Sequence, residues 1–402
     1  MISEIGNYER KVGGKSSDRI MATVYLHIGT MKTGTSALQR FLYENREYLQ
    51  EQGYVYPDMR LDLPADYRFR NGHFLVYSFD RKVQVDEQKF LEDAFGQIGE
   101  LAKKFDHIIL SDEVIWHRSF KKTGFWQKLS EDFRKIDCEI KIILYLRRQD
   151  ELVESLYNQA VKSSQMLNKD FYDYLNGKTV DYFGLHYYDR IEKIEKWIGR
   201  ENITIRIYDK EILKENETFI FYDFLKAIGL TFDEHYKTEQ AVRNPRLQGN
   251  YLELKRIVNS LPEYRKAGNF MLRPMCAANV AGEAGEKKQL LREENFFTPK
   301  ERKAFLGRFE AGNRKLAEEY LGKENGKLFR EPQDKQTMWQ RGEDCLYRDI
   351  MLVTAATFCM QEERMKKLEQ KLEDMKQEEE ERKKAGRWFR RWNRKYSDQK
   401  NE

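Results

Sequence analysis

A loop rich in glycine and threonine near the start of the chain has the composition of an anion-binding site. Residues 29–36 read GTMKTGTS and lie between an apolar run and a segment with helical periodicity. Backbone N–H groups and the helix dipole at such a junction attract phosphate. A triphosphate-binding loop has a lysine directly after its second glycine; here Thr35 takes that place, and Lys32 lies three positions earlier. We therefore expect a site for the bridging oxygen between a 5′-phosphate and one transferable group.

An arginine and a serine follow a later apolar run. Arg147 comes directly after KIILYL, and Ser155 lies about two helical turns further along. A guanidinium group binds phosphate oxygens in a bidentate manner, and a serine hydroxyl adds another donor. The pair predicts a second phosphate site, for which Arg148 is the alternative if the register shifts by one residue.

Together these segments resemble the sulfotransferases that use 3′-phosphoadenosine 5′-phosphosulfate (PAPS), in particular the bacterial carbohydrate-type enzymes. The KTGTS sequence resembles their 5′-phosphosulfate loop, and the spacing of Arg147 and Ser155 resembles their 3′-phosphate signature. Less specific similarity extends over residues 22–329. The resemblance implies PAPS as the donor and adenosine 3′,5′-bisphosphate as the product. It also implies a cofactor site formed by Lys32, Thr33, Gly34, Thr35, Ser36, Arg147 and Ser155.

The implied transfer of a sulfuryl group requires stabilisation of the leaving oxygen and a base for the acceptor proton. Lys32 is our candidate for the first role. Similar enzymes use histidine or glutamate as the base, and the chain offers His73 in RNGHFLVYSF and Glu113 in ILSDEVIW. An ordinary imidazole has a pKa near 6.5, close to the optimum for a general base, which favours His73. Glu113 stays open as the alternative because it follows a predicted strand at the edge where α/β sheets bind ligands.

Strands and helices are predicted to alternate along the region that holds these residues. Apolar runs predict strands at 22–28, 107–110, 141–146 and 202–208. Helical patterns cover 37–49, 151–162, 187–198, 218–228, 250–261 and 299–321. The alternation predicts an α/β protein with a P-loop-like, doubly wound parallel sheet flanked by helices, and a helical C-terminal extension. We divide the chain into a flexible extension (1–20), a sulfotransferase domain (21–330) and a tail (331–402) of helix, short coiled coil and basic aromatic residues.

The composition excludes several classes of protein. The 402 residues carry a net charge of +5, with no global excess of positive charge, so we expect no nucleic-acid partner. The four cysteines form no CxxC pair and no disulfide framework for a chain of this size, which favours a reducing compartment. We also expect no metal site. Because neither a secretory segment nor a membrane-spanning run is recognisable, we expect a cytoplasmic protein.

The expected partners are an acceptor substrate and, through the tail, a second copy of the chain or a membrane surface. The implied acceptor is a hydroxyl or an amine of a carbohydrate or glycolipid. Coiled-coil spacing of Met365, Leu368, Leu372 and Met375 makes the tail helix a candidate for homo-oligomer formation. Eight Lys or Arg and no acid between Arg382 and Lys395 suit peripheral contact with an anionic inner membrane surface.

Two other function classes stay open at this level. A P-loop nucleotide-dependent kinase would need a lysine where Thr35 stands. A non-catalytic nucleotide-binding scaffold protein would have no reason to keep Lys32, Arg147 and Ser155. The sequence leaves the acceptor, the choice between O- and N-sulfation, and the oligomeric state undetermined.

Overall fold

The computed structural model describes most of the chain between residues 21 and 382. The described residues are 21–59, 69–77, 86–175, 179–209, 212, 216, 218–238, 247, 249–260, 272–277, 296–332, most of 349–378, and 382. The predicted extension at 1–20 and the basic aromatic segment after residue 382 lie outside them.

Contacts divide the chain into two compact units. The first comprises residues 1–157, 169–244 and 296–335, and the second comprises 158–168, 245–295 and 336–402. All the predicted cofactor-binding and catalytic residues belong to the first unit.

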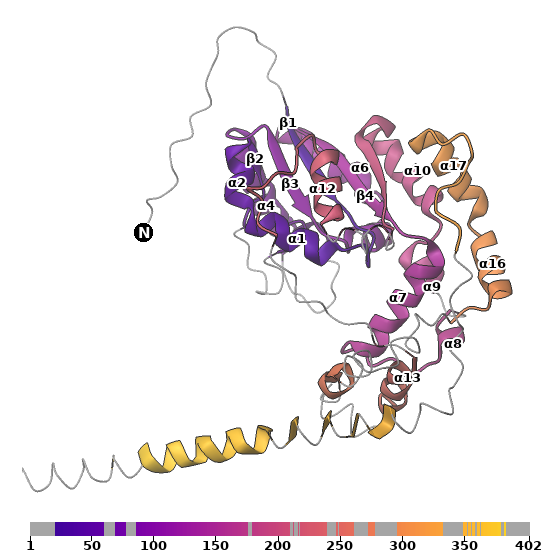
Figure 1. Ribbon diagram of the computed structural model, residues 1–402. Coiled ribbons are helices and arrows are strands. Elements are labelled where there is room, and N and C mark those ends of the chain that lie inside the picture. The colour runs from indigo at the N-terminus through magenta and orange to yellow at the C-terminus, as the bar shows by residue number, and fades with distance from the viewer. Residues whose placement is uncertain are drawn as a thin grey trace, which may run out of the picture. The chain divides into compact units, whose positions relative to one another are not determined.

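A five-stranded sheet, parallel throughout, forms the centre of the first unit, in the order β2-β3-β1-β4-β5 (Figure 1). Its strands are β1 (Ala22–His27), β2 (Tyr54–Val55), β3 (His107–Ser111), β4 (Cys138–Leu146) and β5 (Ile203–Ile207). Four of them coincide with the predicted apolar runs, and the α/β class is confirmed. Because the strands are parallel, their carboxyl ends share one edge, where α/β sheets bind ligands.

Helices cover the sheet because its side chains alternate in direction along each strand. Tyr25, Ile109 and Tyr145 are buried in one cluster with Leu38 and Phe224. The helices of the first unit are α1 (Thr35–Glu44), α2 (Arg46–Glu51), α3 (Phe74–Tyr77), α4 (Glu87–Ala102), α5 (Ile115–Arg118), α6 (Phe125–Lys135), α8 (Phe171–Leu175), α9 (Thr179–Phe183), α10 (Tyr187–Ile198), α12 (Phe219–Ala227), α16 (Pro299–Gly307) and α17 (Glu310–Leu321), with the start of α7 (Gln149–Lys162). Short 3-10 segments lie at Ser119–Lys121 and Arg200–Asn202.

Two of the predicted helices are interrupted. The helix expected over 37–49 ends at Glu44 and resumes as α2, because the side-chain amide of Asn45 donates to the carbonyls of Phe41 and Lys237, each at 2.9 Å. An asparagine that bonds to the backbone in this way favours a helix end over a helix interior. The helix expected over 299–321 is likewise divided into α16 and α17.

The second unit contains helical segments, including α13 (Gly249–Val258) and residues 272–277 and 363–378. The helical C-terminal extension is therefore confirmed. Along 363–378 the predicted coiled-coil residues Met365, Leu368, Leu372 and Met375 are 54–67% exposed, so the coiled-coil pairing stays a prediction. Within the described residues, no helix is both long enough and apolar enough to cross a bilayer.

Candidate functional site

Loop 29–36 joins the end of β1 to the start of α1, as predicted from the sequence. Gly34 is the N-cap of α1, with a left-handed φ of 76°, and the first turn of the helix carries neither a capping side chain nor an acidic residue. The left-handed backbone conformation favours glycine at this position, and a β-carbon there would lie 2.7 Å from Cδ1 of Ile220. The helix therefore presents its N–H groups and positive dipole end without an internal counter-charge.

The loop is held on the neighbouring strand β4. The Thr30 N–H donates to the Tyr145 carbonyl at 2.8 Å, and the Tyr145 N–H donates to the Gly29 carbonyl at 2.7 Å. The Thr33 hydroxyl donates to the Thr30 carbonyl at 2.6 Å. The Thr30 hydroxyl is buried and has no hydrogen-bond partner within the described part of the chain. These bonds fix a loop that still keeps one unused polar group.

The remaining predicted loop residues differ in exposure. Lys32 is half-buried and has a positive φ of 63°, Thr35 is buried, and Ser36 is exposed at the first turn of α1. A positive φ is uncommon for a residue with a β-carbon, and such conformations concentrate at ligand-binding positions.

Arg147 lies against loop 29–36, although 115 residues separate it from Lys32. Its Nη1 donates to the Lys32 carbonyl at 2.9 Å. Its guanidinium carbon lies 5.2 Å from the centre of the Tyr208 ring, and Tyr208 also borders Gly34. The Tyr187 hydroxyl donates to the Arg147 carbonyl at 2.7 Å. The structure thus brings the two signature segments together at one sheet edge.

Ser155 and Glu151 lie on one face of α7. They are four residues apart, which places them one above the other on the helix, and both are half-buried. Glu151 bonds Arg147 at 3.3 Å and Arg148 at 3.1 Å. Ser155 follows Glu151 by about one helical turn, and Glu151 is the α7 residue that contacts Arg147. The sequence reasoning missed Glu151, although its i,i+4 spacing from Arg147 could have revealed it.

His73 belongs to a second group of polar residues, which we call the Asp112 cluster: Gln39, Arg70, His73, Asp112 and Glu113. Nδ1 of His73 lies 2.9 Å from Oδ2 of Asp112. The guanidinium of Arg70 donates to both Asp112 oxygens, at 2.9 and 3.0 Å. His73 is 3% exposed and Asp112 is 0% exposed. Burial alone would raise the pKa of Asp112, but the bond to His73 and the charge of Arg70 hold it below its usual value.

Glu113 connects the Asp112 cluster to loop 29–36. Its Oε2 accepts a bond from Gln39 at 2.8 Å and lies 3.8 Å from Nε of Arg70. A β-carbon at Gly29 would come within 3.1 Å of the Glu113 Cα, Cβ and carbonyl oxygen, so the loop and the end of β3 touch. The two candidate bases, His73 and Glu113, are therefore brought into one cluster beside the loop.

His27, the last residue of β1, also links the loop to the cluster. Its Nδ1 lies 2.8 Å from Oγ of Ser111, and that oxygen accepts from Gln39 at 3.3 Å. Burial lowers the pKa of His27 to about 4. His27 is thus neutral at physiological pH, in a position that sequence reasoning assigned simply to a strand.

The donors near the loop fit a ligand with two phosphate groups. An uncapped helix start, the unused Thr30 hydroxyl and the Arg147 guanidinium are all suited to phosphate or sulfate oxygens. The residues present are therefore chemically compatible with PAPS, the donor that the sequence resemblance implies. Over the described residues, no three His, Cys, Asp or Glu side chains are grouped closely enough to hold a metal ion.

A cavity of about 110 Å³ lies among α3, α4 and α6. One of its walls is Leu75, two residues after His73, and another begins at Lys122, nine residues after Glu113. Its lining is mainly apolar and comprises Leu75, Leu91, Phe95, Lys122, Thr123, Gly124, Phe125, Lys128, Leu129 and Asp132.

Comparisons with known proteins give a curated relative and two solved structures. No family model matches the chain. An uncharacterized protein of Archaeoglobus fulgidus is 30% identical over 221 residues, so the chain spans about half (53%) of the length of that relative, and the match covers 52% of this chain.

The structures have lower similarity. A sulfotransferase from Alicyclobacillus acidocaldarius is 15% identical, with a TM-score of 0.37 over 55% of this chain and 86% of that one. The sulfotransferase domain from the curacin biosynthetic pathway is 11% identical, with a TM-score of 0.35 over 73% of this chain and 98% of that one. Scores below 0.5 carry no functional inference, so the function has to be inferred from the residues of the site.

Proposed function

We propose that the protein is a PAPS-dependent sulfotransferase. The observation that carries this proposal is the 2.9 Å bond from Arg147 to the Lys32 carbonyl. This bond joins loop 29–36 to the arginine that we predict for the 3′-phosphate. The loop carries its lysine at position 32, and Thr35 stands where a triphosphate-binding loop has its lysine. A donor with one phosphate at each end of a nucleoside suits this arrangement better than a triphosphate does.

The bound donor would supply a sulfuryl group on a phosphate leaving group. The N–H groups at the start of α1 and the ammonium of Lys32 would stabilise the negative charge that develops on the leaving oxygen. Fixed donors of this kind are effective because they need no reorganisation during the reaction. The bonds of Thr30 and Thr33 hold the loop in place for this task.

His73 is the better candidate for the base, and Glu113 is the alternative. Nδ1 of His73 lies 2.9 Å from Oδ2 of Asp112 and 3.2 Å from Nη2 of Arg70. In the tautomer that directs the Nδ1 proton to Asp112, Nε2 would take the acceptor proton and Asp112 would stabilise the imidazolium that results. Glu113 accepts a bond from Gln39 at 2.8 Å and lies 3.8 Å from Nε of Arg70, so two donors already hold its carboxylate in place. We therefore assign Glu113 to orienting the acceptor.

The proposed acceptor is a hydroxyl or an amine of a carbohydrate or glycolipid. For an acceptor with an apolar portion, we propose that this portion occupies the mainly apolar cavity among α3, α4 and α6. An alkyl glycoside should therefore be sulfated faster than the free sugar. Equal rates for the two substrates would show that the cavity does not hold the apolar portion of the acceptor.

A thermal-shift comparison tests the assignment against the other classes. A ligand that binds the native state raises the melting temperature by mass action. Adenosine 3′,5′-bisphosphate should stabilise the protein more than ATP or ADP at equal concentration. Stabilisation by ATP instead would indicate a kinase, and stabilisation by none of the three would leave a scaffold protein whose nucleotide loop is no longer used.

A further inference from the structure

The carboxylate of Glu151 bridges two arginines at the proposed 3′-phosphate site. Oε2 lies 3.3 Å from Nε of Arg147, and Oε1 lies 3.1 Å from Nη2 of Arg148. The Glu151 and Arg147 side chains are 14% and 10% exposed, so the pair is largely shielded from solvent. A phosphate group that bound Nε and Nη2 of Arg147 in a bidentate manner would need the position at Nε that this carboxylate now occupies.

The carboxylates offset most of the local positive charge in this state. Arg147, Arg148 and Arg302 carry three positive charges, and Asp150 and Glu151 carry two negative charges. An incoming phosphate dianion would therefore be attracted more strongly once Glu151 leaves Arg147.

Glu151 is the carboxylate that can move. Asp150 is nearly fully buried and is held by Arg148 at 2.7 and 3.1 Å and by Arg302 at 3.2 Å. Glu151 has a second partner in Arg148, so it can leave Arg147 without losing every counter-charge. It also stays in the first turn of α7, where the helix dipole favours a negative charge.

We propose that Glu151 is a displaceable counter-ion of Arg147, which a 3′-phosphate replaces while Arg148 retains the carboxylate. This inference rests on the proposed function, because it takes Arg147 as the 3′-phosphate ligand. A phosphate dianion has the charge and the oxygens to displace one carboxylate, whereas a nucleotide with a 3′-hydroxyl does not. Glu151 would therefore lower affinity for the bisphosphate and keep Arg147 neutralised in the free protein.

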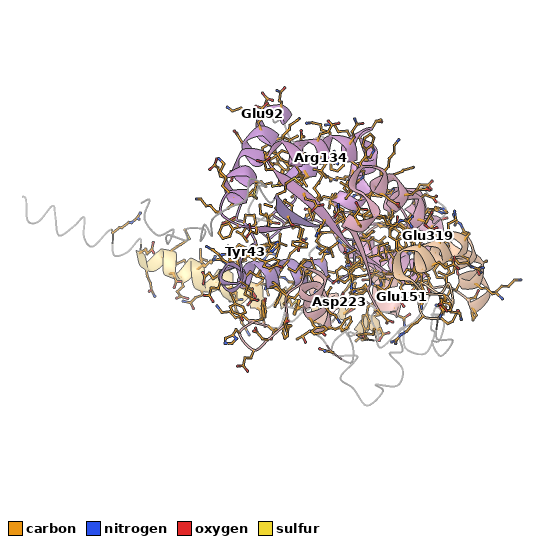
Figure 2. The ribbon with its side chains drawn as sticks, turned by 90° about the horizontal axis from the view of Figure 1, so that it is seen from above. Tyr43, Glu92, Arg134, Glu151, Asp223 and Glu319 are labelled. Carbon is orange, nitrogen blue, oxygen red and sulfur yellow. The ribbon has the colours of Figure 1, made fainter. Side chains whose placement is uncertain are left out.

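Isothermal titration calorimetry with adenosine 3′,5′-bisphosphate and adenosine 5′-monophosphate tests this proposal on the full chain. Glu151→Gln should bind the bisphosphate about tenfold more tightly, since one competing charge-assisted contact is removed. Binding of the monophosphate should change much less. Glu92→Gln is the matched control, because Glu92 is exposed on α4 and lies well apart from Glu151 in Figure 2.

The double variant Arg147→Ala with Glu151→Gln tests the coupling directly. Without Arg147 there is nothing to compete for, so the gain from Glu151→Gln should disappear. Glu151→Asp, which keeps the charge but is shorter, should tighten binding in the same direction by a smaller factor, and it serves if the glutamine variant folds poorly.

The outcomes separate the inference from the function. If the wild type binds the bisphosphate and Glu151→Gln binds it equally or more weakly, the counter-ion role is wrong and the proposed function survives. A gain that persists without Arg147 would also overturn the role. If neither protein binds the bisphosphate, the proposed function fails, and the inference fails with it.

Discussion

Loop 29–36 and the Asp112 cluster lie beside each other, but the loop presents mainly backbone groups and the cluster consists of side chains. The loop offers an anion mainly backbone N–H groups and a helix dipole, all supplied by one short stretch of sequence. The cluster consists of side chains from α1, from residues 70–73 and from the end of β3, up to 74 residues apart. A site formed by backbone groups can be recognised from one local sequence motif. A site formed by side chains from distant segments exists only after the chain has folded.

This difference has a consequence for mutation. Backbone donors survive most side-chain replacements as long as the glycine positions are kept. The buried cluster has no such tolerance, because each removed partner leaves another polar group unsatisfied. Substitutions in the cluster should therefore have larger effects than substitutions in the loop, apart from Lys32.

The largest effect is expected for His73. If His73 is the base, His73→Ala should lower turnover by about 10²–10⁴ while the affinity for adenosine 3′,5′-bisphosphate stays unchanged. Glu113→Gln should mainly raise the KM for the acceptor. His235→Ala is the control, because His235 is an exposed histidine that also faces an aspartate, Asp233, at 3.3 Å. The roles reverse if Glu113→Gln is inactive and His73→Ala keeps most of the turnover.

Lys32 is the loop side chain that should behave like a cluster residue. Loss of a donor to a developing negative charge typically costs about 10²–10³ in turnover, and we expect this for Lys32→Ala. The variant should still fold and bind the product nucleotide through the backbone. Lys193→Ala, exposed on α10, controls for the loss of a surface charge. Near-normal turnover would show that Lys32 has only a structural role and that the loop acts through its backbone N–H groups alone.

The pH dependence of stability should report on His27, which joins the two regions. Its folded pKa of about 4 is lower than the unfolded value of 6.5, so the unfolded chain binds an extra proton between these values. The resulting stability is full above pH 6.5 and is lost as the pH falls toward 4. The loss amounts to about 3 kcal/mol at 1.36 kcal/mol per pKa unit. Urea unfolding of His27→Asn should show about that much less loss between pH 7 and 4, and parallel curves would contradict the assignment.

The smallest effect is expected for Arg147. Losing one charged hydrogen-bonded contact costs roughly 1.5–3 kcal/mol, so Arg147→Ala should weaken binding of adenosine 3′,5′-bisphosphate by about 10- to 150-fold. Binding of adenosine 5′-monophosphate should hardly change, because the proposed site of its phosphate is loop 29–36. Arg134→Ala on α6 is the control, since Arg134 is exposed and labelled apart from Glu151 in Figure 2. Equal losses of affinity for both nucleotides would show that Arg147 does not bind the 3′-phosphate.

The contrast between local backbone sites and side-chain clusters also explains which features could be predicted from the sequence. Four strands and loop 29–36 could be predicted, because apolar runs and glycine spacing are local signals. The end of α1 at Asn45 could not, because one of its two acceptors, Lys237, lies 192 residues away. Asp112 was visible beside Glu113, yet its contact with His73 depends on residues 39 apart. Glu151 was overlooked because a charged residue on a helix face ordinarily points to solvent.

The contact between Gly29 and Glu113 fixes the spacing between loop 29–36 and the Asp112 cluster. A side chain at Gly29 would press on the backbone of Glu113 from 3.1 Å and move the ends of β1 and β3 apart. Under the proposed function, the donor at loop 29–36 and the acceptor beside the Asp112 cluster would then be held further apart, and transfer depends on close, aligned reacting atoms. A side chain at Gly29 should therefore slow transfer although it removes no functional group.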